Sequence, residues 1–220
     1  MIDAASQAIS LEWSKIHETQ NRLLLTGSTF ASTMRTLGVA GRIKSGQNVL
    51  EIGVGFGFSA RGLDEMGCRV SVLDVCAEAF RCVEGIAAGT YLHETCNAMP
   101  SRTFDWALSL LVTQHMSDTD ILWQFPHVFR SLKDDGIFAT QWAGSTIPGE
   151  NDCLESIIGT MPDPEKVGGV DMLSGRMVRS HKHAQTLIDR SGGEVLSIGP
   201  RRDFPEYKAY WFTTESRRAR

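Results

Sequence analysis

The chain has 220 residues, of which 42% are hydrophobic and 22% are charged. This composition is that of an ordinary globular protein and excludes a disordered or fibrous chain, and the length fits one large domain. The formal net charge is −4, whereas nucleic-acid-binding domains usually carry a basic excess, so we expect no nucleic-acid partner.

The five cysteines are odd in number and no two of them have C-x-x-C spacing. This pattern predicts neither a zinc site nor a disulfide framework and favours a reducing compartment. The first residues lack the basic and apolar segments of a signal peptide, and no stretch approaches 18 consecutive apolar residues. We therefore expect a cytoplasmic protein with no membrane segment.

The first half of the chain alternates between helical and strand-like periodicity. Apolar residues recur at near-helical spacing through 8–25, and Phe30, Met34 and Leu37 indicate a second helix. The segments that follow predict strands at 48–53, 69–74 and 90–95, and helices at 59–66 and 77–87.

The second half continues the alternation around one long interruption. It predicts strands at 104–111, 136–142, 195–198 and 207–213, and helices at 118–132 and 180–191. Strands that alternate with helices in this way predict an α/β fold, with a mostly parallel seven-stranded sheet and helices on both faces.

The interruption, residues 143–178, is rich in proline and glycine, and it includes a short helical stretch near 154–161. A connection of this length is usually functional or flexible. We expect it, together with the N-terminal helices, to cover a site at the edge of the sheet.

A glycine-rich turn follows the first predicted strand, in the segment Glu51-Ile-Gly53-Val-Gly55-Phe-Gly57-Phe58. Glycines allow a tight turn and let a ligand approach the backbone without meeting a Cβ atom. The dinucleotide pattern G-x-G-x-x-G would place its third glycine where Phe58 stands, which disfavours a nicotinamide oxidoreductase. The alternative is a tight strand–helix turn that binds no ligand.

This spacing resembles the first motif of class I S-adenosylmethionine (SAM)-dependent methyltransferases, (D/E)-x-G-x-G-x-G. The resemblance implies a Rossmann-like fold, SAM as cofactor, S-adenosylhomocysteine as product, and no metal. In that family the loop packs against the amino-acid and ribose parts of SAM. The residues it implies for this contact are Glu51, Gly53, Val54, Gly55 and Gly57.

Two later segments strengthen the resemblance. Asp74 lies 21 residues after Gly53, where an acid accepts hydrogen bonds from ribose hydroxyls in nucleotide-binding folds, and Val75 follows it. Asn97 and Ala98 match the family position that contacts adenine, because an amide can both donate and accept hydrogen bonds. The alternatives are an exposed aspartate at a strand end and an asparagine that starts a turn before a proline.

The resemblance extends over residues 46–142. The segment 104–111 and the loop after it are similar to the family's fourth strand and its following loop, which implies that Leu111 contacts the cofactor. The segment Leu132-Lys-Asp-Asp-Gly136 matches the family's L-(K/R)-x-x-G turn into the fifth strand.

The predicted substrate-side residues follow the fourth and fifth strands, because ligands of parallel α/β sheets bind beyond the carboxyl ends of the strands. His115 is the candidate general base, since an imidazole titrates near neutral pH. The alternatives are that His115 caps a helix or lies in a loop, and that the enzyme works by alignment without a base. The other predicted substrate-side residues are Thr113, Gln114, Gln141 and Trp142.

We interpret residues 1–220 as a single domain. It divides into an N-terminal helical cover (1–40), a cofactor-binding core (46–142), an insertion or lid (143–178), and a closing helix with strands (179–214).

The expected function is transfer of a methyl group from SAM to an oxygen or nitrogen of a small molecule, such as a sugar or a specialised metabolite. One alternative is a non-catalytic SAM-binding or regulatory protein. Another is a transferase of a different adenosyl-linked group, such as an aminopropyl transferase, but that family has an acidic pair after the fourth strand that this chain lacks.

Overall fold

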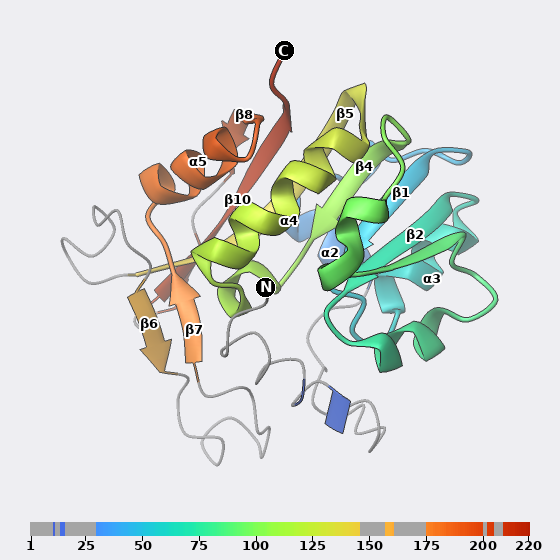
Figure 1. Cartoon of the computed structure of the whole chain (residues 1–220), viewed down its shortest axis with the longest axis horizontal. Helices are drawn as coiled ribbons and strands as arrows, with labels where there is room; N and C mark the ends of the chain where they lie inside the picture. The colour runs from blue at the N-terminus through green and yellow to red at the C-terminus, as the bar shows by residue number, and fades with distance from the viewer. Residues whose placement is uncertain are drawn as a thin grey trace.

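The computed structural model of the chain describes residues 11, 14–15, 30–145, 157–160, 175–199, 202–204 and 209–220. Most of the helix predicted at 8–25 and most of segment 143–178 lie outside these described residues. The described part of the chain forms an α/β fold around one large sheet, as the sequence predicts (Figure 1).

Seven strands form the main path of the sheet, in the spatial order β3-β2-β1-β4-β5-β10-β8. Neighbours from β3 to β5 are parallel, whereas β10 runs antiparallel to both β5 and β8. The predicted seven-stranded, mostly parallel sheet is confirmed, and a short strand β9 (Arg202–Phe204) also pairs with β10. The strands of the main path are β1 (Asn48–Ile52), β2 (Arg69–Asp74), β3 (Gly89–Leu92), β4 (Phe104–Ser109), β5 (Leu132–Ser145), β8 (Gly193–Ile198) and β10 (Ala209–Arg218).

The order of the strands reverses at β1, which pairs with β2 on one side and with β4 on the other. In open α/β sheets such a reversal leaves a crevice beyond the carboxyl ends of the strands. Helix α2 (Phe30–Thr36) precedes β1. The helical elements that follow β1 are α3 (Phe58–Glu65), α4 (Asp118–Ser131) and α5 (His181–Arg190), with the 3-10 turns η2 (Ala77–Val83), η3 (His93–Ala98) and η4 (Thr113–His115).

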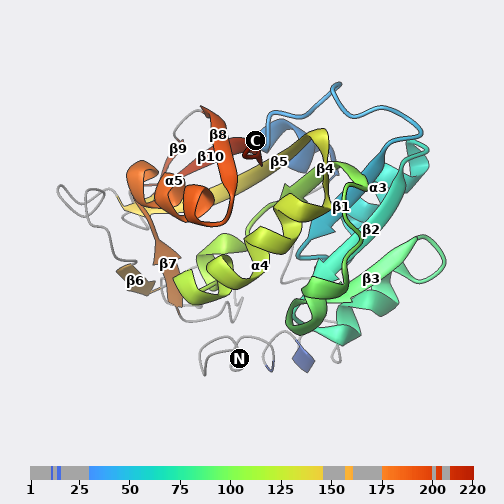
Figure 2. The same ribbon diagram turned by 45° about the horizontal axis from the view of Figure 1, so that its top comes forward.

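The helices cover both faces of the sheet and bury two hydrophobic layers (Figure 2). On one face, Phe125 and Phe129 of α4 and Leu187 of α5 pack against the sheet. On the other face, Met34 of α2 and Leu63 of α3 do the same. Burial of these apolar side chains drives the helices onto the sheet and fixes where each connecting loop emerges.

Serine caps fix the start of the two helices on the first face. Ser117 and Asp120 form a reciprocal capping box at the start of α4, and the side chain of Ser180 accepts a hydrogen bond from the backbone N–H of His183 in α5. Each cap satisfies a backbone donor that a helix start would otherwise leave without a partner. The first cap also determines where the loop between β4 and α4 ends.

Several predicted boundaries differ from the structure. The helix predicted at 77–87 is the shorter turn η2, and the strand predicted at 136–142 is the longer β5. The helical stretch predicted near 154–161 is wrong where it is described, because 157–160 form the strand β6 (Ile157–Thr160), which pairs antiparallel with β7 (Gly175–Val178). Pairing with a distant segment overrides local propensity there.

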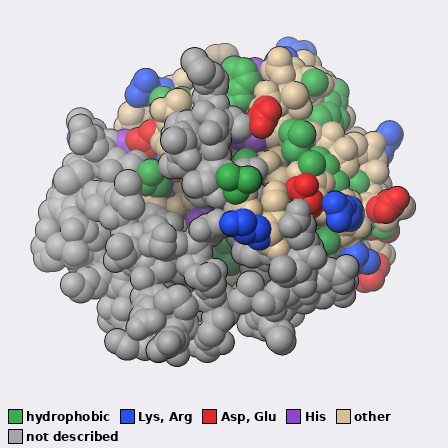
Figure 3. Space-filling model, turned by 60° about the horizontal axis from the view of Figure 1, so that its bottom comes forward, with side chains coloured by type: hydrophobic (Ala, Val, Ile, Leu, Met, Phe, Trp, Pro, Cys, Tyr) green, Lys and Arg blue, Asp and Glu red, His purple; other side chains and the backbone are tan. Residues whose placement is uncertain are grey.

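The described surface carries mixed charge. Figure 3 shows acidic and basic side chains interspersed among hydrophobic ones on the face that is turned forward. Among the described helices, none is long and apolar enough to cross a bilayer.

Candidate active site

A cavity lies at the carboxyl ends of β1, β2 and β4, at the reversal of strand order. Its wall combines residues 53–56 of the glycine loop (residues 53–57), the end of β2, parts of the β4–α4 loop (residues 110–117), and side chains from α2, α3 and α4. The structure thereby brings together many of the residues predicted from sequence. Those in the wall are Glu51, Gly53, Val54, Gly55, Asp74, Val75, Leu111 and His115.

The glycine loop has a backbone that only glycine adopts easily. Gly53, Gly55 and Gly57 have φ angles of 78°, 52° and 74°, in the left-handed region that disfavours residues with a Cβ atom. A Cβ atom on Gly53 would also overlap the side chain of Val112, and one on Gly57 would lie 2.8 Å from the carbonyl oxygen of Cys82. Gly53 thus allows close packing of the β4–α4 loop, while Gly57 serves the start of α3 outside the cavity wall.

Asp74 ends β2 and ties it to the glycine loop. Its Oδ2 accepts a hydrogen bond from the backbone N–H of Val54 at 2.7 Å, and its Oδ1 accepts one from the N–H of Cys76 at 2.9 Å. Burial raises the pKa of Asp74, and these N–H groups oppose that rise. The N–H groups of Val75 and Gly55 also act on this carboxylate, so Asp74 holds the turn after β2 and the glycine loop together.

Glu51 is a buried acid in the wall of the cavity. The residue is 7% exposed, and no described residue is a hydrogen-bond partner of its Oε2. Burial raises the pKa of Glu51 to about 8, the negative charge of Asp74 adds to the rise, and hydrogen bonds from Ser59 and from the N–H of Ala60 oppose it. A buried acid with a strongly shifted pKa in a cleft is typical of a functional site.

A polar cluster of His93, Asp120 and Gln124 forms another part of the wall, between η3 and α4. Nδ1 of His93 lies 2.7 Å from Oε1 of Gln124, and its Nε2 lies 3.6 Å from Oδ1 of Asp120. Burial lowers the pKa of His93, but the hydrogen bonds to Asp120 and Gln124 and the charges of Asp120 and Glu94 outweigh this effect and raise it.

The amide of Gln124 has spare hydrogen-bonding capacity. Gln124 is 3% exposed, and its Nε2 has no hydrogen-bond partner among the residues that the structure describes. Because a buried donor without a partner is costly, this atom is a natural point of contact for an acceptor on a bound ligand.

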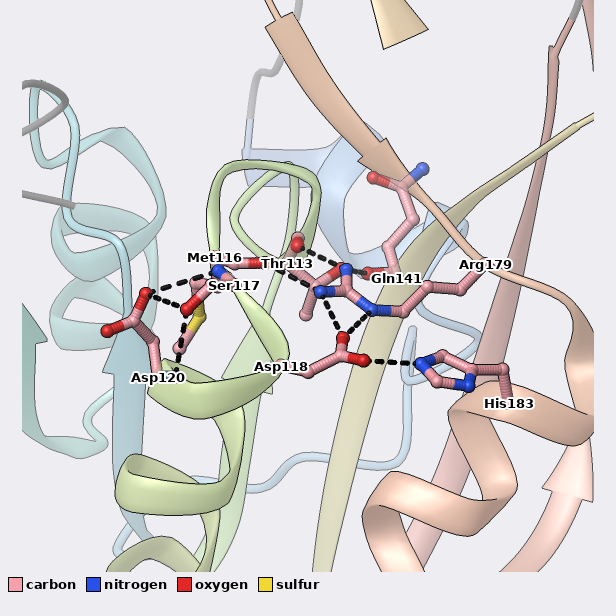
Figure 4. Close-up of polar contacts among 8 residues, drawn as sticks. All are labelled: Thr113, Met116, Ser117, Asp118, Asp120, Gln141, Arg179 and His183. Atoms are coloured by element: carbon pink, nitrogen blue, oxygen red, sulfur yellow. Dashed lines mark hydrogen bonds and ion pairs between the residues drawn. The ribbon is translucent and has the colours of Figure 1, made fainter. Parts of the chain in front are cut away.

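The β4–α4 loop is strained and held by β5. Leu111 has a φ angle of 58°, which costs on the order of 1–3 kcal/mol for a residue with a side chain. Its N–H donates to Oε1 of Gln141 at 3.2 Å, and its carbonyl accepts from Nε2 of Gln114 at 2.6 Å. The hydroxyl of Thr113 donates to the backbone carbonyl of Gln141 at 2.6 Å (Figure 4). The loop therefore curls back over the end of β5.

His115 lies in the cavity wall, and its Nε2 is 3.2 Å from Nε2 of Gln114. The carbonyl of Leu111 requires that end of the Gln114 side chain to be the NH2 group, so Nε2 of His115 acts as an acceptor. His115 therefore becomes available to take a proton from a substrate only when this hydrogen bond is released.

Some predicted residues lie outside the cavity wall. Asn97 and Ala98 are exposed on η3, so the structure places His93 and Gln124, rather than Asn97, in the wall beside η3.

The four other predicted substrate-side residues are buried side chains that support the β4–α4 loop and the sheet. Thr113, Gln114 and Gln141 hold the loop as described above, and Trp142 is fully buried with its Nε1 donating to Thr214.

Sequence reasoning also missed wall residues. The hydrophobic side chains of Leu37 and Phe58 and the polar ones of His93 and Gln124 line the cavity. Apolar spacing marked Leu37 only as a helix residue, and no local pattern distinguishes His93 or Gln124, because their contact joins segments 31 residues apart. In the described part of the chain, no group of three or more His, Cys, Asp and Glu side chains is arranged to hold a metal ion.

Comparison with known families supports the resemblance noted above. Residues 50–140 match the family described as methyltransferase domain. These residues include the glycine loop, Asp74, the polar cluster and the β4–α4 loop, so the match covers most of the cavity. No curated protein matches the chain.

Solved structures with the same fold include three that align over nearly all of this chain. A 1,6-didemethyltoxoflavin-N1-methyltransferase from Burkholderia thailandensis, with bound 1,6-didemethyltoxoflavin and S-adenosylhomocysteine, is 13% identical, with a TM-score of 0.67 over 100% of this chain and 92% of that chain. A magnesium protoporphyrin IX methyltransferase from Synechocystis PCC 6803, with bound S-adenosylhomocysteine, is 12% identical, with a TM-score of 0.62 over 98% of this chain and 100% of that chain.

The third is the cyclase SpnF, which is 13% identical, with a TM-score of 0.67 over 100% of this chain and 98% of that chain. At these identities the likeness shows the shared fold alone. Because a cyclase shares it, the reaction has to be argued from the site.

Proposed function

Because the chain belongs to the class I SAM-dependent methyltransferases, with its methyltransferase domain at residues 50–140, we propose that it transfers a methyl group from SAM to an oxygen or nitrogen of a small molecule. We further propose that residues 46–142 form the cofactor-binding core. Within the remaining chain, Thr33 of α2 and Leu37 directly after it line the cavity, which supports a covering role for residues 1–40.

The observation that carries this proposal is a pair of carboxyl groups beside the glycine loop, of which that of Glu51 is buried and that of Asp74 is partly buried. Glu51 and Asp74 both line the cavity, and Oε2 of Glu51 has no hydrogen-bond partner in the described part of the chain. SAM carries an ammonium group and a sulfonium, whose positive charges a carboxylate stabilises. It also carries two ribose hydroxyls, from which a carboxylate accepts hydrogen bonds. We assign the ammonium end of SAM to Glu51 and the ribose hydroxyls to Asp74.

We assign the edge of the adenine ring to the polar cluster of His93, Asp120 and Gln124. Ring nitrogens of adenine are hydrogen-bond acceptors, and Nε2 of Gln124 is a buried donor that lacks one. This replaces the contact that the sequence predicted for Asn97, whose side chain is exposed.

The chemistry is an in-line displacement at the methyl carbon. A lone pair on the acceptor oxygen or nitrogen forms the new bond to carbon, the carbon–sulfur bond breaks with its electron pair going to sulfur, and S-adenosylhomocysteine leaves. The acceptor loses one proton in the process. The chain contributes alignment of the two reactants, and His115 is the wall residue that is able to receive the proton once it releases Gln114.

Two large apolar side chains support a small, partly apolar acceptor. Phe58 and Leu111 line the cavity and remain 47% and 41% exposed. Apolar walls with few polar groups are typical of small-molecule sites. The two methyltransferase structures named above hold S-adenosylhomocysteine, one of them together with 1,6-didemethyltoxoflavin.

Incubation with SAM labelled in its methyl group, in the presence of fractionated small molecules from cells, tests the proposal. We expect labelled product and S-adenosylhomocysteine to accumulate in equal amounts, and neither to accumulate with the Asp74→Ala variant. Tight SAM binding without any labelled product across the fractions would contradict methyl transfer and favour the non-catalytic alternative.

A further inference from the structure

We propose that Arg179 is a positioning residue that holds the β4–α4 loop against the cofactor cavity through the carbonyl groups of Thr113 and Met116. This inference rests on the proposed function, because it assumes that the cavity binds SAM. Arg179 follows β7 in the chain, far from the loop in sequence, and it does not line the cavity itself.

The guanidinium of Arg179 is buried against the loop and almost fully used. Nη1 donates to the carbonyl of Thr113 at 2.9 Å, and Nη2 donates to the carbonyl of Met116 at 2.6 Å (Figure 4). These two carbonyls belong to the turn η4 and the residue directly after it. The planar fork of an arginine therefore bridges the turn at both ends, a geometry that a lysine ammonium does not reproduce.

Asp118 makes burial of this charge possible. Nε and Nη2 of Arg179 lie 2.9 and 2.8 Å from Oδ1 of Asp118, while Nε2 of His183 lies 2.6 Å from Oδ2 (Figure 4). The side chain of Arg179 is 1% exposed, whereas that of Asp118 is 30% exposed. A buried guanidinium requires such a charged partner. Because Asp118 is the first residue of α4, Arg179 holds the start of α4 as well as the β4–α4 loop.

Arg179 is also fixed from the side of the sheet. Its backbone N–H donates to the carbonyl of Ala143 in β5 at 2.7 Å, and its guanidinium carbon lies 5.8 Å from the ring centroid of Trp142. Arg179 thus links β5 to the β4–α4 loop. Gln141 of β5 makes a second link, because it bonds to Leu111 and Thr113.

The loop it holds is the part of the cavity wall most dependent on support. Leu111 is strained, and Val112 packs so closely on Gly53 that a Cβ atom there would overlap it. Strain of this kind persists only where surrounding contacts enforce it. Loss of the anchor at Thr113 and Met116 is therefore expected to relax the loop and loosen its packing on the glycine loop.

Hydrogen exchange on the ligand-free protein tests the effect on the loop directly. In Arg179→Lys we expect faster exchange at the amides of His115 and Met116, whose hydrogen bonds lie within the loop, and unchanged exchange at Leu50 and Val72 in β1 and β2. His183→Ala is the matched control, because it removes the other partner of Asp118 without touching the loop carbonyls, and it should leave the loop amides protected. Unchanged loop exchange in Arg179→Lys, or an equal rise in β1 and β2, would overturn the proposal.

Chemical rescue tests the effect on the site. We expect Arg179→Ala to bind S-adenosylhomocysteine about tenfold more weakly, the size of effect of one lost charge-assisted hydrogen bond, and millimolar guanidinium chloride to restore most of the affinity. Sodium chloride at the same concentration should not restore it, and a variant that is merely unstable would gain no affinity from guanidinium. If guanidinium restores nothing, the positioning role is wrong. If the wild-type protein binds no S-adenosylhomocysteine, the proposed function fails, while the exchange experiment still decides the role of Arg179 in the loop.

Discussion

The carboxylate of Asp74 and the backbone N–H of Val54 lie 2.7 Å apart and form a hydrogen bond that joins the end of β2 to the glycine loop after β1. The same carboxylate accepts the N–H of Cys76 through its other oxygen. Asp74 therefore has a structural role in shaping the loop as well as the proposed role of binding the ribose hydroxyls.

We expect Asp74→Asn to weaken S-adenosylhomocysteine binding by about 1–3 kcal/mol, the range for a hydrogen bond to a charged group. An amide nitrogen in place of one oxygen removes acceptor capacity both for the loop and for the ribose. Calorimetric titration measures the change, with Asp189→Asn, an exposed residue of α5 outside the cavity wall, as the control. Equal affinities of Asp74→Asn and wild type would remove Asp74 from the binding site.

Binding of SAM should release a proton from Glu51 near neutral pH. The pKa of Glu51 is about 8 in the ligand-free protein, so the group is mostly protonated at pH 7, whereas the ammonium of SAM favours the ionised form. Affinity should therefore rise as the pH increases from 6 toward 8. Calorimetry at pH 7 in two buffers with different ionisation enthalpies gives the number of protons released. Glu51→Gln should release markedly fewer, and an equal release from both proteins would show that Glu51 is not the source.

The stability of the ligand-free protein gives an independent check on Glu51. Because its folded pKa lies above the ordinary value of 4.5, the folded state binds more protons than the unfolded state between these values, and Glu51 lowers stability progressively as the pH rises from about 4.5 to 8. At pH 9, Glu51→Gln should exceed the wild type in free energy of unfolding, by up to about 5 kcal/mol for a shift of this size. The difference should shrink toward pH 5 in denaturant titrations.

Gln124 and Asn97 are rival contacts for the adenine edge. We expect Gln124→Leu to weaken S-adenosylhomocysteine binding by about 1–3 kcal/mol, because it removes the buried donor Nε2. Asn97→Ala should leave binding unchanged, since its side chain is exposed outside the cavity wall. The opposite ranking in the same titrations would restore the assignment made from the sequence motif.

His115 is expected to assist proton removal from the acceptor. Once an acceptor is identified, His115→Ala should lower kcat by at least about tenfold, since general-base help is worth 10²–10⁴ in rate, with little change in SAM affinity. His115→Gln retains hydrogen bonding but takes up no proton near neutral pH, so its kcat should fall as far as that of His115→Ala. Single-turnover rates between pH 6 and 8 should also be flatter for both variants. Full activity of His115→Gln would make the residue a hydrogen-bonding support.

The elements predicted correctly are those whose signals are local. Glu51, Gly53, Gly55 and Asp74 belong to one strand–turn–helix–strand unit, so their spacing alone places them together at the cavity. The parallel order of β1 to β5 follows from the same alternation of strands and helices.

The remaining errors arise from contacts between distant segments. Thr113 follows β4 and Gln141 lies near the end of β5, so the sequence predicts that both side chains face the methyl group. Instead the loop folds back, and the hydroxyl of Thr113 donates to the backbone carbonyl of Gln141. The meeting of His93 with Gln124, and the insertion of Arg179 beneath the loop, depend on how α4 and β7 pack in three dimensions. Neither has a periodicity or spacing that a single sequence displays.

Isothermal titration of the purified protein with S-adenosylhomocysteine, SAM and NAD tests the central claim most directly. The account predicts saturable binding of one molecule of S-adenosylhomocysteine or SAM per chain, competition between the two, and far weaker binding of NAD, because the glycine spacing after Glu51 differs from the dinucleotide pattern. Saturable binding of NAD, with no heat from either SAM or S-adenosylhomocysteine, would contradict the assignment of this cavity as a methyltransferase cofactor site.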